Sequence, residues 1–201
     1  MTGKERILKE ARTLFAEKGF SGTSIRMIAD NAGVTKSLIY HHFGSKRTLW
    51  REVSQDLLLS ANLPEKIKKM VHTFDFGKGR DCSKVGEKQI PPYFEFLRDN
   101  TEFARMLAWM DAEKDSSLVS ENPFLEVAVE RLKEYQLKEY IRDDIDPRIL
   151  IISMMAVCEI WFTAQERLGM LFGKDITGDD MNSEYIETVM KLLFEGVKRS
   201  K

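Results

Sequence analysis

The chain has 201 residues, of which 43% are hydrophobic and 31% charged, and its formal net charge is −1. These values are typical of a soluble globular protein and exclude disordered, collagen-like and disulfide-rich classes, while the length allows one large domain or two small ones.

The charged N-terminal stretch predicts no signal peptide, and the longest apolar-rich stretch is short and contains Glu159, which predicts no membrane span. Cys82 and Cys158 match neither metal-site spacing nor a disulfide framework, so we expect free thiols in a cytoplasmic protein.

Positive charge is concentrated in the N-terminal quarter of the chain. Residues 1–54 contain ten lysines and arginines and five acidic residues, whereas the remainder contains 21 basic and 27 acidic residues. A basic segment on an acidic body suggests that this segment alone meets a polyanion, although exposed helices also carry charge simply for solubility.

The first predicted helix is amphipathic and ends at a glycine. Apolar residues recur on one helical face from Ile7 to Phe15, and Gly19 stands where a left-handed C-cap would end the helix. A short turn follows, after which Ser24 is a suitable N-cap for a second helix over 25–32.

The next two predicted helices are separated from their neighbours by glycines. Gly33 tolerates the positive φ of a tight turn, and Thr35 is a suitable cap for a helix over 36–43. Ser45 is the natural cap of a fourth helix over 46–63. Three short helices joined around a glycine predict a helix-turn-helix arrangement, in which the third helix presents its outer face.

The remainder of the chain is also helical in its periodicity, and no strand-like alternation competes with it. A polar stretch over 77–89, with three glycines, predicts an exposed loop. Asp146 and Pro147 together predict the start of the most apolar helix. We therefore predict an all-α fold of about nine helices, the later ones over 65–74, 91–100, 101–115, 120–140, 147–168 and 183–201.

The outer face of the predicted third helix suits duplex DNA. Val34, Ile39 and Phe43 are the apolar residues that would lock this helix to its neighbours. Tyr40 is poor core material among lysine, hydroxyls and imidazoles, but its hydroxyl can reach a phosphate while its ring touches a thymine methyl group. Lys46 and the free backbone N–H groups at the start of the fourth helix add phosphate donors.

Two adjacent histidines, His41 and His42, allow three interpretations. Neighbouring residues on a helix project about 100° apart, whereas a shared metal ion needs partners three or four residues apart, and no suitable carboxylate or thiol stands nearby. Surface histidines without a role are the second possibility. The surrounding cap, turn glycine and basic residues favour the third, in which both imidazoles donate to phosphates.

The segment 19–50 resembles the DNA-binding region of the TetR family of transcriptional regulators. The resemblance lies in Thr-Ser before an Ile-x-x-Ile-Ala helix, Ala-Gly-Val in the turn, and Tyr-x-x-Phe followed by Ser-Lys. Many relatives have glycine at the position of Ser37, so base preference there is open, and Met27 removes the acidic partner of a capping box. By position, the resemblance implies DNA contacts from Ser24, Arg26, Thr35, Lys36, Ser37, Tyr40, His41, His42 and Lys46.

The C-terminal part resembles the dimerisation region of the same family more weakly. This resemblance implies a homodimer formed through the last two helices, which suits a helix over 147–168 that is apolar nearly all round, although such a helix could also be buried in a larger monomer. Methionines and aromatics at helical spacing usually fill a core, but they also suit a pocket for an apolar effector. The candidate pocket residues are Phe103, Met106, Leu107, Met110, Met154, Cys158, Trp161 and Phe162.

Together these features predict a cytoplasmic homodimeric transcriptional regulator, most simply a repressor. Residues 1–47 would bind a palindromic operator in double-stranded DNA, and residues 48–201 would dimerise and bind a small apolar or amphipathic effector that relieves operator binding. The alternative is a DNA-bound structural or cell-division factor on the same fold without an effector. We expect no enzymatic activity, cofactor or metal, because no nucleophile elbow, phosphate-binding glycine loop or metal-ligand set is present.

Overall fold

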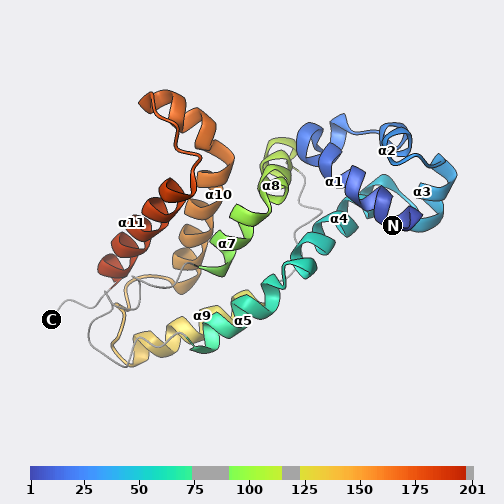
Figure 1. The fold of residues 1–201 in the computed structure, drawn as a ribbon. Coiled ribbons are helices and arrows are strands. Elements are labelled where there is room, and N and C mark those ends of the chain that lie inside the picture. The colour runs from blue at the N-terminus through green and yellow to red at the C-terminus, as the bar shows by residue number, and fades with distance from the viewer. Residues whose placement is uncertain (74–90, 115–122, 198–201) are drawn as a thin grey trace. The chain divides into compact units, whose positions relative to one another are not determined.

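The computed structural model of the protein describes residues 1–73, 91–114 and 123–197. Over these ranges the chain forms ten α-helices, which confirms the all-α fold. The helices belong to two units, one made of residues 1–62 and 100–121 and the other of residues 63–99 and 122–201. Figure 1 labels the helices in chain order. The loop predicted over 77–89 and Cys82 lie outside the described residues.

The first unit combines the N-terminal helices with one helix from much later in the sequence. Large apolar side chains from several of these helices are buried together, and the Phe15 and Trp50 rings meet edge to face at 4.8 Å. This later helix packs against the N-terminal helix, so the unit is closed by residues about ninety positions further along the chain. Its helices are α1 (Gly3–Gly22), α2 (Ile25–Ala32), α3 (Lys36–Phe43), α4 (Lys46–Ser60) and α8 (Thr101–Glu113).

The short helices of this unit begin at the residues predicted to cap them. The hydroxyl oxygens of Ser24, Thr35 and Ser45 accept hydrogen bonds from backbone N–H groups three residues later, at 3.2, 3.2 and 3.0 Å. Each cap satisfies one of the N–H groups that a helix start leaves without an intrahelical partner. At the start of α1, Thr2 and Glu5 form a complete capping box.

The end of α1 differs from the simple C-cap that the sequence predicts. Gly19 does adopt a positive φ, but its φ of 70° and ψ of −179° lie outside the left-handed helical region. The regular helix therefore breaks at Gly19, and one further turn continues to Gly22. The break directs the chain into Thr23, whose hydroxyl donates to the Leu14 carbonyl inside the unit.

The predicted fourth helix is shorter than expected. It ends at Ser60 because Asn62 adopts a positive φ of 52°, which no regular helix contains. The next helix, α5, begins at Leu63 with Pro64 in its first turn, where the missing proline N–H leaves no hydrogen bond unmade.

The second unit contains α5 (Leu63–Thr73), α7 (Pro92–Asp99), α9 (Pro123–Leu137), α10 (Pro147–Phe172) and α11 (Asp179–Val197). An aromatic cluster joins three of these helices: Trp161 of α10 stacks on Tyr185 of α11 at 3.9 Å, and Phe162 of α10 lies 4.8 Å from Phe94 of α7. The indole N–H of Trp161 donates to Asn182 at 2.8 Å, so the cluster also satisfies its polar groups.

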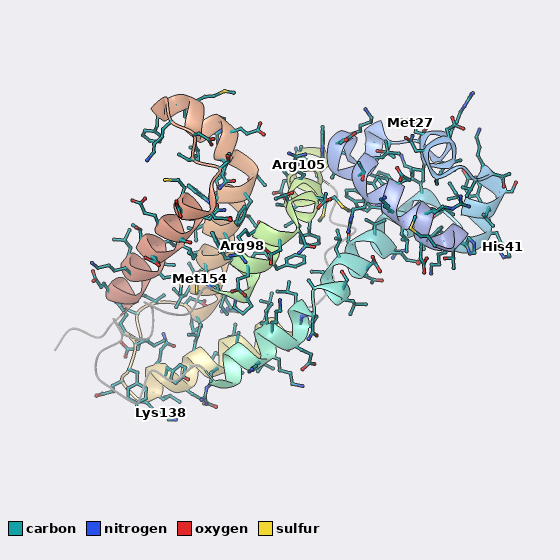
Figure 2. The ribbon with its side chains drawn as sticks, viewed as in Figure 1. Met27, His41, Arg98, Arg105, Lys138 and Met154 are labelled. Atoms are coloured by element: carbon teal, nitrogen blue, oxygen red, sulfur yellow. The ribbon has the colours of Figure 1, made fainter. Side chains whose placement is uncertain are left out.

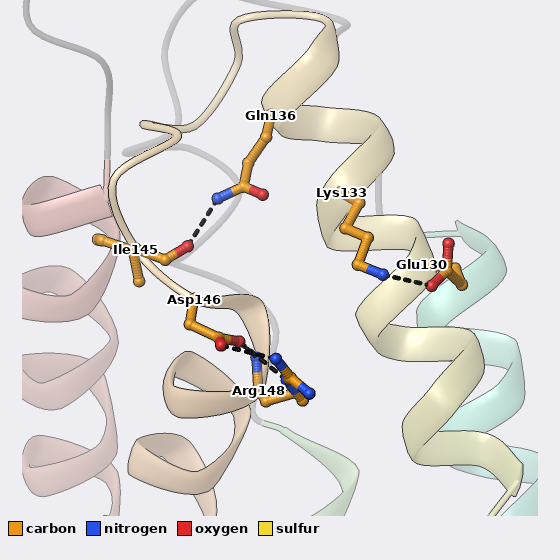
Figure 3. Close-up of polar contacts among 6 residues, drawn as sticks. All are labelled: Glu130, Lys133, Gln136, Ile145, Asp146 and Arg148. Atoms are coloured by element: carbon orange, nitrogen blue, oxygen red, sulfur yellow. Dashed lines mark hydrogen bonds and ion pairs between the residues drawn. The ribbon is translucent and has the colours of Figure 1, made fainter.

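The connection between α9 and α10 is fixed by side chains at both of its ends. On α9, Gln136 donates to the Ile145 carbonyl at 2.7 Å, as Figure 3 shows. At the start of α10, the Asp146 carboxylate accepts from the Arg148 backbone N–H at 2.8 Å and from its guanidinium at 3.0 Å. The predicted cap at Asp146, with proline in the first turn, is therefore confirmed. The guanidinium of Arg148, followed by its backbone N–H, lowers the pKa of Asp146.

The longest helix, α10, exposes much of its apolar surface. It has 26 residues and is long and apolar enough to cross a membrane, so the length argument against a membrane span is wrong. Only 17% of its most apolar window is buried within the chain. Apolar helices of soluble proteins have the same length and composition, so these properties alone do not place the chain in a membrane. Among the residues that the structure describes, most of this apolar window is left uncovered.

Candidate nucleic-acid interface

The candidate interface begins at the three-residue turn between α2 and α3. Gly33 ends α2 in the left-handed conformation, with φ 63° and ψ 42°, as the sequence predicts. The Val34 N–H then returns to the Ala29 carbonyl at 3.0 Å, which satisfies a carbonyl at the end of α2. Thr35 caps α3 immediately afterwards, so the turn is short and held at both ends.

The α3 helix separates buried from exposed residues as predicted. Ile39 and Phe43 are 0% and 3% exposed and hold the helix to the rest of the unit, while Val34 is half-buried. Tyr40 is 51% exposed, so its ring does not belong to the core and is open to contact with another molecule. Lys36, Ser37, His41 and His42 are exposed with it, and Figure 2 labels His41 at the edge of the unit.

The histidine pair lies open to solvent at the end of α3. The two ring centroids are 5.4 Å apart with an interplanar angle of 64°, and the His42 ring also contacts Phe43 at 6.0 Å. Among the described residues, no group of three histidine, cysteine or acidic side chains is placed to hold a metal ion. Both imidazoles are exposed and can donate hydrogen bonds, His41 projecting about 100° and His42 about 200° round the helix from Tyr40.

The residues predicted to contact DNA at the start of α2 and α3 also form hydrogen bonds or ion pairs within their own helices. The hydroxyls of Ser24 and Thr35 accept from backbone N–H groups, yet each retains its own O–H to donate to a phosphate. Arg26 is exposed and lies 3.7 Å from Asp30 one turn later, an exposed pair that contributes little to stability.

Lys46 makes more contacts within the protein than the sequence suggests. Its ammonium donates to the backbone carbonyls of Phe20 at 2.8 Å and Thr23 at 2.9 Å, and it lies 4.1 Å from the centre of the Phe20 ring. Burial lowers the pKa of Lys46, the charge of Glu113 opposes this shift, and Arg47 adds to it. Two of its three N–H donors are therefore used at the α1–α2 junction, and one is left for a phosphate.

The eight candidate effector residues are divided between the two units. Phe103, Met106, Leu107 and Met110 lie on α8 in the first unit, whereas Met154, Cys158, Trp161 and Phe162 lie on α10 in the second. That they form one pocket stays a prediction. A separate open cavity of about 390 Å³ follows the end of α10, lined in part by Gln165, Gly169 and Ile176, and none of the eight residues lines it.

Two residues of α8 that the site prediction omits contact the helix-turn-helix region. The Trp109 indole N–H donates to the Ala16 carbonyl at 3.2 Å, and the Glu113 carboxylate accepts from Ser21. No local pattern around residue 109 or 113 indicates a partner about ninety positions earlier. Only the fold brings them to α1.

Two family models match separate segments of the chain. Residues 7–53 match the model of bacterial regulatory proteins of the TetR family, and residues 88–193 match the model of the tetracycline repressor-like C-terminal domain. The second match alone covers more than half of the chain.

Individual relatives agree with the family models. The uncharacterized HTH-type transcriptional regulator YerO of Bacillus subtilis is 33% identical over 158 residues, which cover 76% of this chain but about half, 52%, of YerO. The HTH-type transcriptional repressor KstR2 of Mycolicibacterium smegmatis is 42% identical over 55 residues, or 27% of each chain. Among solved structures, the TetR family transcriptional regulator PfmR from Thermus thermophilus aligns over 100% of both chains, with a TM-score of 0.67 and 20% identity, and shares the fold.

The helix-turn-helix geometry, the two domain matches and these relatives lead to one assignment. The chain belongs to the TetR family, whose members are helix-turn-helix transcriptional regulators and not enzymes.

Proposed function

We propose that the protein is a homodimeric repressor whose operator binding is relieved by a small apolar or amphipathic effector. Residues 1–47 act in DNA binding and residues 48–201 in dimerisation and effector binding, within a cytoplasmic protein. The observation that carries the proposal is the division of α3 into a buried face with Ile39 and Phe43 and an exposed face with Lys36 and Tyr40. Repression is supported by KstR2, which is described as a repressor.

In this proposal α3 enters the major groove, and its neighbours fix it by phosphate contacts. Lys36 and Tyr40 are one turn apart on the exposed face, so both reach the same groove. Ser24, Arg26, Thr35, Ser37, His41, His42 and the remaining donor of Lys46 bind backbone oxygens. In a dimer, two such helices must be about 34–36 Å apart, or a multiple of this distance, to enter successive major grooves.

The exposed stripe on α10 supports the dimer. Ile149, Ile152 and Ile160 are 58%, 58% and 49% exposed, and with the exposed Ala156 their spacing of i, i+3, i+7 and i+11 places them on one side of the helix. Leu192 of α11 is 65% exposed. A second copy that covers this stripe would remove an apolar surface that water otherwise solvates unfavourably.

The effector proposal is supported by the chemistry of the second unit. Aromatic side chains from α7, α10 and α11 gather there with few polar groups, the combination that binds apolar ligands with one or two anchoring hydrogen bonds. The Tyr93 hydroxyl, which donates to Glu159 at 2.5 Å, is a candidate anchor. A panel of apolar and amphipathic compounds should include some that raise the melting temperature with concentration, whereas a DNA-bound structural factor would respond to none.

Selection of bound duplexes from a random DNA pool tests the core of the proposal. The expected product is a palindrome whose half-sites are separated by about 10 base pairs or a multiple. By fluorescence anisotropy, Tyr40→Ala and Lys36→Ala should each weaken binding of the selected duplex by about tenfold or more, the usual loss for one specific base contact. Enrichment of no duplex at low salt, or wild-type affinity in both variants, would contradict it.

A further inference from the structure

Helix α8 holds the end of α1 through two side chains one helical turn apart. The indole N–H of Trp109 donates to the Ala16 carbonyl at 3.2 Å. The two carboxylate oxygens of Glu113 accept from the Ser21 backbone N–H at 3.1 Å and from its hydroxyl at 2.9 Å. These bonds lie on either side of Gly19, where the regular α1 helix breaks, so α8 fixes both sides of the break.

Gly19 itself lies directly against these two side chains. A Cβ atom at this position would lie 2.7 Å from the Glu113 Oε1 and 2.8 and 2.9 Å from two ring atoms of Trp109. Such distances are shorter than real Cβ contacts, so the absence of a side chain at Gly19 is what allows α8 to approach. At this point the packing of α8 against α1 therefore requires glycine.

Lys46 holds the same segment from α4. Its ammonium donates to the carbonyls of Phe20 and Thr23, while the Glu113 carboxylate accepts from Ser21 between them. Within residues 20–23 the carboxylate thus accepts from the N–H and hydroxyl of Ser21, while the ammonium donates to the carbonyls of Phe20 and Thr23, so both are charge-assisted hydrogen bonds. This segment leads directly into Ser24 and α2, and Lys46 follows Ser45, directly beyond the end of α3. The arrangement fixes where α2 and α3 leave the rest of the unit.

We propose that Glu113, supported by Trp109, is a positioning residue for DNA binding: it sets the orientation of α2 and α3 through the α1–α2 junction. The inference rests on the proposed function, because it assumes that α3 contacts DNA. Glu113 touches no DNA itself. It acts on operator affinity and on the preferred half-site spacing, through the backbone of residues 20–23.

Glu113→Gln separates this role from simple electrostatics. The substitution removes a negative charge from a DNA-binding unit, which by itself should strengthen binding to a polyanion. It also leaves only one oxygen for the two Ser21 donors, so the junction loses a charge-assisted hydrogen bond. The matched control is Glu102→Gln on the same helix, which makes the same charge change at a half-exposed, long pair with Arg12 at 3.9 Å.

The experiment uses the full chain and the duplex selected by the wild-type protein. We expect Glu113→Gln to bind it about tenfold more weakly, with faster amide exchange over residues 16–24 and an altered half-site spacing when the selection is repeated. Glu102→Gln should match or slightly exceed wild-type affinity. A merely structural role would lower the melting temperature and leave the spacing and the affinity of the folded protein unchanged.

Each result decides between these roles. Wild-type affinity in Glu113→Gln despite faster exchange at the junction would overturn the proposal, as would equal losses in both variants. If Glu113→Gln does not fold, Ser21→Ala removes only the 2.9 Å hydroxyl bond and should still weaken DNA binding, and an unchanged affinity would overturn the proposal. Failure of the wild-type chain to bind any duplex would instead reject the proposed function.

Discussion

Replacement of Gly19 by alanine should be unusually destabilising for a single added methyl group. The backbone at Gly19, with φ 70° and ψ −179°, lies in a region that is almost restricted to glycine, and a side chain there costs about 1–3 kcal/mol. The new Cβ would also lie within 3 Å of Trp109 and Glu113, an overpacking that costs about 1–3 kcal/mol more. We expect a total loss of about 4 kcal/mol, equivalent to about 8–16 °C in melting temperature for a chain of this size.

Two other glycines separate the two contributions to this loss. Gly44 has a φ of 71° in the same unit, but a Cβ atom added there would meet nothing within 4 Å, so Gly44→Ala should lose only the backbone part, about 1–3 kcal/mol. Gly196 lies in the last turn of α11 with open space around it, so Gly196→Ala should cost no stability and gain at most about 0.5 kcal/mol. The measurement is urea unfolding followed by tryptophan fluorescence and circular dichroism. Equal losses for Gly19→Ala and Gly44→Ala would refute the steric argument and, with it, the close fit of α8.

Three further predictions test other parts of the molecule. Ile152→Asp on the exposed stripe of α10 should convert the proposed dimer to a monomer in light scattering, whereas Leu137→Asp on α9, which is 85% exposed, should not. Burial, followed by the charge of Glu159, raises the pKa of Tyr93 above its ordinary 10.0. Above pH 10 the unfolded chain therefore loses a proton that the folded chain keeps, and the free energy of unfolding should fall as the pH rises. Tyr93→Phe should flatten that fall in urea titrations at pH 9 to 11. Burial also raises the pKa of Cys158 from 9.0 to about 12, so at pH 8 iodoacetamide should modify it roughly a thousandfold more slowly in the native protein than in urea, as peptide mass spectrometry would measure.

The local features of the fold were predictable from the sequence because they depend on neighbouring residues. Ser24, Thr35 and Ser45 cap their helices by bonds that span three residues, and the pattern of a hydroxyl before an apolar period indicates each of them. The burial of Ile39 and Phe43 and the exposure of Tyr40 follow from helical periodicity in the same way. The contacts of these exposed residues with DNA stay a prediction, since no partner is present.

The contacts that span long distances in the chain were not predictable. In the sequence Lys46 resembles any exposed basic side chain, but its partners stand 23 and 26 residues earlier. Glu113 and Ser21 are separated by 92 residues, and neither position carries a pattern that indicates the other. The length argument about α10 failed for a related reason, because it measured the apolar run and not the helix that contains it.

The brevity of α3 has a consequence for how such proteins change their targets. Eight residues are too few for an independently stable helix in water, so its conformation depends on the anchors Ile39 and Phe43 and on the cap at Thr35. The outward side chains take no part in that anchoring. In the proposed DNA-binding role, exchange of Lys36, Ser37 or Tyr40 would therefore change the recognised base sequence while the anchored helix keeps its thermodynamic stability.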